Sequence, residues 1–223
     1  MLDFHVHFSK RNKNSICSLD ISECDKLPEM LFMFTFGVHP WFLKSKMAFN
    51  KFEKILNDIY SGEYGVNVYD NFIGLGECGL DRLKGPEMEL QKKMFMNICR
   101  IGIDFDLPMV IHCVKAYPEI LSVYKKYNNQ LRWAVHSFSG NLVEAEKLIN
   151  KNIFLSFGER LLSSRKLQKI FTEIPVNMIF LETDDADITV TKLYEFGAEL
   201  KGMNISSFTA QIQKNIFNFF AIL

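Results

Sequence analysis

The sequence lacks the features that mark several protein classes. Its five cysteines are an odd number with no C-x-x-C pair, which argues against a disulfide framework and against a cysteine zinc site. The formal net charge is zero, which does not fit a basic nucleic-acid coat. No apolar run reaches the roughly 18 residues of a membrane span, and the first residues show no signal-peptide pattern. We therefore expect a cytoplasmic protein without a membrane partner.

Apolar residues, by contrast, are abundant. Hydrophobic residues make up 48% of the 223 positions, and 21 of them are phenylalanine, which is enough for a large core. The chain shows no repeat, no low-complexity segment and no linker-like stretch. We therefore expect one domain over residues 1–223, and a monomer is favoured although the sequence does not decide the oligomeric state.

Strand-like apolar runs alternate with helical patterns along the chain. The expected strands are Leu2–Val6, Ser15–Ile21, Phe32–Val38, Phe72–Cys78, Met109–Cys113, Trp133–Ser137, Ile153–Phe157 and Met178–Glu182. The expected helices are Phe49–Tyr60, Met88–Phe105, Tyr117–Tyr127, Val143–Asn150, Ser164–Glu173, Val190–Lys201 and Phe208–Phe220. Such alternation favours parallel βαβ units closed into a (β/α)8 TIM barrel, which usually takes roughly 250 residues.

The first βα units are too short for a regular barrel. Residues 8–14 alone separate the first two strands, which leaves no room for a crossover helix. The next connection, over residues 22–31, is also short. We therefore predict a barrel that is distorted or shortened at these units. A doubly wound open sheet is the alternative, but no glycine-rich phosphate loop follows the first strand.

Polar side chains cluster at the carboxyl ends of the expected strands. All histidines of the protein and two carboxylates lie at or near such ends; they are His5, His7, His39, Glu77, His112, His136 and Asp184. In a barrel these ends converge on one mouth, where active sites are built. Imidazole and carboxylate ligands suit zinc, manganese or iron, and less exclusively magnesium. The set exceeds the needs of one tetrahedral ion and fits two divalent ions roughly 3.5–4 Å apart.

Strand alternation suggests roles for the neighbours of these groups. Asp3 shares a face with His5 and His7, and Glu182 shares a face with Asp184, each one layer deeper. We therefore expect both acids to orient metal ligands, with a buried structural acid as the alternative for Glu182. For His39 we favour a contact to substrate or to a ligand over direct metal binding.

Basic residues in the expected βα connections suggest the substrate. They are Lys10, Arg11, Lys13, Arg82, Lys84, Lys115 and Arg160, all on the rim that carries the histidines. Together they could bind phosphate, although each one alone is more often a solvated loop residue. We name Arg11, Arg82, Lys115 and His39 as candidate substrate-binding residues. Trp41 and Phe42 could stack on a base or pack under the loop.

In several segments along its length, the chain resembles the TatD-type metal-dependent hydrolases within the amidohydrolase-like barrels. The matching segments are Asp3–His7, Gly37–Trp41, Gly74–Asp81, Leu107–His112, His136–Gly140, Leu181–Asp184 and Asn215–Phe220. The resemblance implies metal ligation by His5, His7, Glu77, His112, His136 and Asp184, with Glu77 as the bridging carboxylate. It also implies metal-dependent hydrolysis of phosphodiester bonds in DNA, often with magnesium.

Three departures from the family pattern bear on the substrate. The segment between His7 and Gly37 is shorter than in typical members, Trp41 stands where the family usually has a second histidine, and residues 185–189 replace a basic loop. In these respects the chain resembles a shorter bacterial branch of the family.

We expect a water activated by two divalent ions (magnesium, zinc or manganese), with Asp184 as general base and Glu77 holding both ions. The expected substrate is DNA or a small phosphoester. One alternative is hydrolysis of C–N or C–O bonds in a small molecule at the same centre. Another is a non-catalytic metal-binding or nucleic-acid-binding protein, which is disfavoured because all six ligands are present.

Overall fold

A computed structural model describes residues 1–43, 47–127 and 130–222. Eight parallel strands stand in the order of the sequence. They are β1 Asp3–His7, β2 Ser15–Asp20, β3 Phe34–Gly37, β4 Phe72–Asp81, β5 Met109–Val114, β6 Trp133–Val135, β7 Phe154–Phe157 and β8 Ile179–Leu181. Each one falls on an expected strand, with ends that differ by up to two or three residues. The sequential order and the meeting of β8 with β1 confirm the barrel and rule out the doubly wound sheet.

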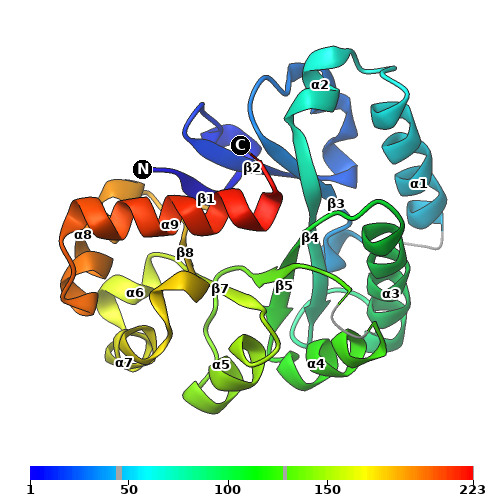
Figure 1. The fold of residues 1–223 in the computed structure, drawn as a ribbon. Coiled ribbons are helices and arrows are strands. Elements are labelled where there is room, and N and C mark those ends of the chain that lie inside the picture. The colour runs from blue at the N-terminus through cyan, green and yellow to red at the C-terminus, as the bar shows by residue number, and fades with distance from the viewer. Residues whose placement is uncertain (44–46, 128–129, 223) are drawn as a thin grey trace.

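Helices surround this barrel (Figure 1). They are α1 Met47–Tyr60, α2 Val66–Asn71, α3 Met88–Asp104, α4 Tyr117–Lys126, α5 Leu142–Ile149, α6 Arg160–Ser163, α7 Arg165–Glu173, α8 Val190–Lys201 and α9 Ile205–Phe220. The short helices α2 and α6 were not expected, because so few residues cannot show a helical period. Several of the others begin at a capping side chain, such as Asn141 before α5, which forms a capping box with Glu144.

The first two connections contain only 3₁₀ turns, as the short segments required. Phe8–Lys10 follows β1 and Ile21–Glu29 follows β2, so no α-helix covers these strands from their own βα loops. The seam between β8 and β1 is also thin. One isolated bridge pairs Val6 with Asp184, and the Asp184 N–H donates to the His5 carbonyl at 3.0 Å. The barrel is therefore nearly closed, with its weakest pairing beside the residues of β1.

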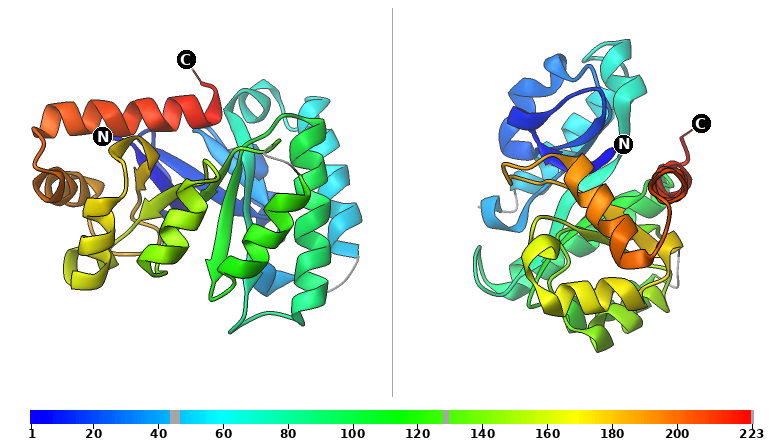
Figure 2. Two further views of the ribbon diagram at one scale, coloured as in Figure 1. Left: turned by 60° about the horizontal axis from the view of Figure 1, so that its bottom comes forward. Right: turned by 90° about the vertical axis from the view of Figure 1, so that its left-hand side faces the viewer.

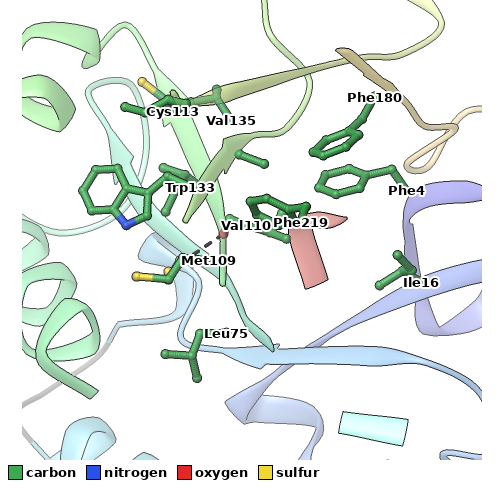
Figure 3. Close-up of a cluster of buried hydrophobic side chains, with 14 of the residues drawn as sticks. Phe4, Ile16, Leu75, Met109, Val110, Cys113, Trp133, Val135, Phe180 and Phe219 are labelled. Atoms are coloured by element: carbon green, nitrogen blue, oxygen red, sulfur yellow. Dashed lines mark hydrogen bonds between the residues drawn. The ribbon is translucent and has the colours of Figure 1, made fainter. Parts of the chain in front are cut away.

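The last helix supports this seam. In the two views of Figure 2, α9 crosses the β1 and β8 side of the barrel. Phe219 packs at 5.4 Å from Phe180, which stacks on Phe4 at 4.2 Å between ring centroids (Figure 3). The Asn215 side chain donates to the Ile179 carbonyl at 2.9 Å, at the start of β8. These packed phenylalanines lie at the amino ends of the strands. Polar residues lie at the opposite mouth of the barrel.

The strand β1 is irregular. The register of β1 against β2 shifts between Asp3 and Val6. As a result Asp3 and Val6 border one depression, whereas His7 borders the cavity at the barrel mouth. Such an irregularity interrupts the period of two, on which the prediction of a shared face for Asp3 and His7 was based.

Among the described residues, no helix is both long and apolar enough to cross a membrane.

Candidate metal centre

Glu77 lies at the middle of the histidine cluster. Its Oε1 atom is 2.7 Å from His136 Nε2 and 3.0 Å from His39 Nε2, and it touches His112 Nδ1. Its Oε2 atom is 3.5 Å from His5 Nε2. Burial alone would raise the pKa of Glu77, but His136, His112 and His39 hold that pKa well below its usual range. An ionised carboxylate thus faces histidines from four different parts of the barrel.

Glycines allow this carboxylate to approach β5. Gly76 and Gly79 flank the Glu77–Cys78 pair, and both have positive φ, +134° and +150°. A Cβ atom at Gly79 would lie 2.1 Å from the His112 carbonyl oxygen. The register of β4 against β5 also shifts between Leu75 and Cys78. This irregular strand brings Glu77 against His112, and a strand of ordinary side chains could not come so close.

A second group forms beside β1. His7 Nε2 lies 3.2 Å from Asp184 Oδ1, and His5 Nε2 lies 4.0 Å from the same oxygen. The Asp184 carboxylate raises the pKa of His7 to about 9 in the metal-free protein, against the effect of burial. Although burial raises the pKa of Asp184, the neighbouring histidines lower it to about 2. Asp184 also has a φ of +52°, a left-handed conformation that aspartate tolerates better than most residues.

These groups have the arrangement that divalent ions need. Three ligand atoms within 4.8 Å of one another occur in the sets His5–His7–Asp184, His5–Glu77–His136, His39–Glu77–His112 and His136–Glu182–Asp184. One atom at the centre, His5 Nε2, is buried without any hydrogen-bond partner. A buried polar atom left unpaired is costly, and a bound cation would satisfy it. The imidazole and carboxylate donors suit zinc, manganese or magnesium.

Asp81 fixes the orientation of His112, a role that the sequence did not reveal. Asp81 Oδ2 lies 3.1 Å from His112 Nε2 and also accepts a hydrogen bond of 2.6 Å from Trp41 Nε1. These partners, with the Leu83 N–H, hold the pKa of Asp81 below its usual range despite its burial. With an ion bound at the centre, an ionised Asp81 would hold the proton-bearing nitrogen of His112 and leave Nδ1 free to bind that ion. Its place after a glycine-rich strand was visible in the sequence, but its partner was not.

The two expected supporting acids occupy different places. Glu182 Oε1 lies 3.4 Å from His136 Nδ1 and accepts a 2.7 Å hydrogen bond from the Ser137 N–H, so it lies where it could orient His136. Asp3 instead accepts two hydrogen bonds from Thr183, at 2.9 Å from N–H and 2.7 Å from the hydroxyl. Asp3 therefore anchors the turn next to Asp184 and does not touch a histidine ring.

His39 lies inside the cluster, nearer than the sequence suggested. Its Nδ1 atom accepts a 3.2 Å hydrogen bond from the Trp41 N–H, which leaves the proton on Nε2, the nitrogen facing Glu77. A protonated nitrogen donates a hydrogen bond and has no lone pair for a metal. Asp20, a second residue that the sequence did not single out, accepts a 2.8 Å hydrogen bond from the His39 N–H.

The cluster opens into a cavity of about 420 Å³ at the barrel mouth. Its described lining residues are His7, Ser18, Asp20, Ser22, Glu23, His39, Trp41, Phe42, Glu77, His112, His136, Asp184 and Asp185. This lining has five carboxylates and, among the residues described, no lysine or arginine. Even with His7 and His136 protonated, the metal-free cavity has an excess of carboxylates, and bound cations would offset that charge.

The structure does not bring the three predicted basic contacts into this cavity. Arg11 pairs with Glu29 at 3.1 Å, and Arg82 pairs with Glu119, so both guanidinium groups are held by carboxylates outside it. Lys115 is exposed in the loop after β5 and does not border the cavity. The phosphate rim expected from these residues is thus absent from the described cavity wall.

A comparison with known protein families identifies the family of this chain. The model of the TatD related DNases matches residues 16–221, nearly the whole chain. The protein belongs to this family. A deoxyribonuclease TATDN1 homolog of Vairimorpha ceranae, named as putative, is 29% identical over 128 residues, 56% of this chain and 47% of that protein. The metal-dependent hydrolase YabD of Bacillus subtilis, named as uncharacterized, is 27% identical over 68% of each chain.

Other TatD-family relatives agree with this placement. A TATDN1 homolog of Encephalitozoon cuniculi is 26% identical over 81% of this chain and 61% of that protein. The chain thus spans about half to two thirds of the length of these relatives. The crystal structure of the TatD homolog YjjV of Escherichia coli matches all of this chain and 98% of its own, with a TM-score of 0.86 and 17% identity. At that identity the match shows the same fold.

Proposed function

We propose that the protein is a two-metal hydrolase that cleaves phosphodiester bonds, with a DNA strand or a small phosphoester as substrate. One observation carries the proposal: Glu77 Oε1 faces His39, His112 and His136, whereas Glu77 Oε2 faces His5 on the side of β1. His5, His7 and Asp184 would hold one ion, His112 and His136 the other, with Glu77 shared. Membership in the TatD related DNases supports the choice of phosphodiesters.

Divalent ions bound there would supply an activated water and would polarise the phosphoryl group. The chain itself provides a proton acceptor and a hydrogen-bond donor. Asp184, ionised above its low pKa of about 2, is the general base at the cavity. His39 Nε2 carries a proton next to Glu77 and would donate a hydrogen bond to an oxygen of the substrate.

The cavity wall explains why the ions would also bind the substrate. Because the described lining has five carboxylates and no lysine or arginine, its acidic groups outnumber the histidines whose pKa is raised, His7 and His136, and the metal-free site would disfavour a phosphodiester. We therefore infer that phosphate binding depends on the ions and not on Arg11, Arg82 or Lys115. All five cysteines are free thiols, which fits a reducing cytoplasmic location.

Metal reconstitution tests this function. Protein stripped by a chelator is loaded with magnesium, manganese or zinc and assayed on single-stranded DNA, bis(p-nitrophenyl) phosphate, a lactone and an amide. We expect metal-dependent turnover of the phosphodiesters and two ions per chain by elemental analysis. Turnover of the lactone or amide alone would favour the C–N and C–O alternative. A chain that retains no divalent ion would refute the proposal.

A further inference from the structure

One wall of the metal cavity is aromatic and exposed. Trp41 and Phe42 lie in the 3₁₀ turn Pro40–Phe42 that follows β3, and they keep 37% and 47% of their surface exposed. They are the only apolar side chains among the described residues that line this cavity. Large rings that only filled the core would be buried, as the other tryptophan, Trp133, is in full.

The Trp41 ring is held in place while part of it stays open. Its Nε1–H donates to Asp81 at 2.6 Å, which fixes the plane of the indole. The Lys84 ammonium lies 3.4 Å from the ring centroid and covers one face as a cation–π contact. His39 meets the ring at 4.8 Å between centroids, nearly perpendicular. The ring is therefore preorganised by neighbours and does not have to be ordered by a ligand.

The aromatic wall is close to the proposed reaction centre. The centroids of the Trp41 and His112 rings are 5.6 Å apart, and those of His39 and Phe42 are 5.7 Å apart. In a nucleotide a single sugar separates the base from its phosphate. A base that lies on Trp41 and Phe42 would thus leave its phosphate near Glu77, where we place the ions.

We infer that Trp41 and Phe42 form a base-stacking subsite for an unpaired base next to the phosphate that is cleaved. This inference rests on the proposed function and assigns contact with the base beside the scissile phosphate to two side chains of the turn Pro40–Phe42, where Trp41 departs from the family pattern. Aromatic side chains stack on any base, because every base has a π face, so little sequence preference is expected. A base within a duplex is already stacked and would have to leave its partner to reach this wall.

Binding measurements test the subsite without any turnover. Adenosine 5′-monophosphate and ribose 5-phosphate carry the same phosphate, and only the first has a base. We expect the metal-loaded protein to bind the nucleotide about 10-fold more tightly, within the range of base stacking. Of the two tryptophans only Trp41 borders the cavity, so the nucleotide should quench its emission while ribose 5-phosphate does not.

Variants separate stacking on the Trp41 ring from the hydrogen bond that its indole N–H donates to Asp81. Trp41→Leu and Phe42→Leu should each reduce the preference for the nucleotide several-fold, whereas Trp41→Phe should retain part of it because a ring remains. Phe217→Leu is the matched control, since Phe217 is also exposed, at 39%, but lies in α9. This control should bind both ligands as the wild type does. Calorimetry measures the variants that lack Trp41, and circular dichroism checks their fold.

The outcomes of the two proposals are distinguishable. Equal binding of both ligands to an enzyme that hydrolyses bis(p-nitrophenyl) phosphate would overturn the subsite and leave the hydrolase. A preference for the nucleotide in a protein that hydrolyses no phosphodiester would leave the subsite and overturn the proposed function. An unchanged preference in both leucine variants would also overturn the subsite.

Discussion

Asp81 Oδ2 lies 3.1 Å from His112 Nε2, and this contact selects the ring nitrogen that His112 presents to Glu77. The same oxygen accepts the indole N–H of Trp41, so one carboxylate connects the aromatic wall with a candidate metal ligand. A histidine held in this way is a better metal ligand, because its tautomer and orientation are fixed before the ion binds.

The Asp81→Asn variant should therefore bind the metal ion that we assign to His112 and His136 more weakly. Asparagine can offer its amide to His112 and favour the wrong tautomer, and such changes typically lower metal affinity about 10- to 100-fold. Competition with a chromophoric chelator measures the affinity. Asp70→Asn, an exposed residue of α2, is the control and should bind metal normally. Wild-type affinity in Asp81→Asn would show that the contact does not prepare the ligand.

Metal affinity at the β1 side should rise with pH. The pKa of His7 is raised to about 9, so in the metal-free protein its ring holds a proton at neutral pH, which an ion must displace. The affinity should increase up to about tenfold per pH unit between about 6.5 and 9 and then level off. The His7→Asn variant should lose this dependence. Chelator competition at a series of pH values measures both proteins.

The stability of the metal-free protein should respond to pH in the opposite sense. A raised pKa stabilises the fold when the group is protonated, so the His7 contribution is complete below about pH 6.5 and is lost as the pH rises through about 9. The lowered pKa of Asp184 adds stability above about pH 4 that is lost toward pH 2. Thermal unfolding of the stripped protein should therefore show its highest midpoint between these limits, and a midpoint that rises from pH 6.5 to 9 would contradict the pairing.

Asp184→Asn should remove most turnover and keep the fold. Asparagine has the same shape and also tolerates the positive φ of +52°, but it cannot accept a proton as a base. The expected loss in kcat is about 10²- to 10⁴-fold. Assays at saturating metal, with circular dichroism of the variant, check this. The nearby exposed Asp187→Asn should retain activity, and a wild-type rate in Asp184→Asn would exclude Asp184 as the base.

Gly79→Ala should destabilise the barrel strongly. The new Cβ would lie 2.1 Å from the His112 carbonyl at a φ of +150°, so β4 and β5 would have to move apart. A loss of about 3 kcal/mol in the free energy of unfolding is expected from such strain. Gly62→Ala is the matched control, because its φ is also positive, +79°, but nothing lies within 4 Å; it should cost about 1 kcal/mol. Chemical denaturation compares the two, and equal losses would mean that close strand approach is not required.

The sequence by itself determined the strands and the polar residues at their ends. Buried parallel strands are short apolar runs, and each carries its polar residue at a fixed place, so His112 and His136 could be assigned to the mouth without knowledge of their partners. The short segments after β1 and β2 likewise determined that no crossover helix could form there.

Only the tertiary structure decided which side chains meet. Asp81 contacts His112, Asp3 accepts a hydrogen bond from Thr183, and Arg82 pairs with Glu119, 37 residues away. The irregular registers of β1 and β4 also change which faces their residues share. Such contacts depend on how loops fold over the mouth and where strands slip. Local periodicity describes a regular strand, and it carries no information about partners brought together from distant parts of the chain.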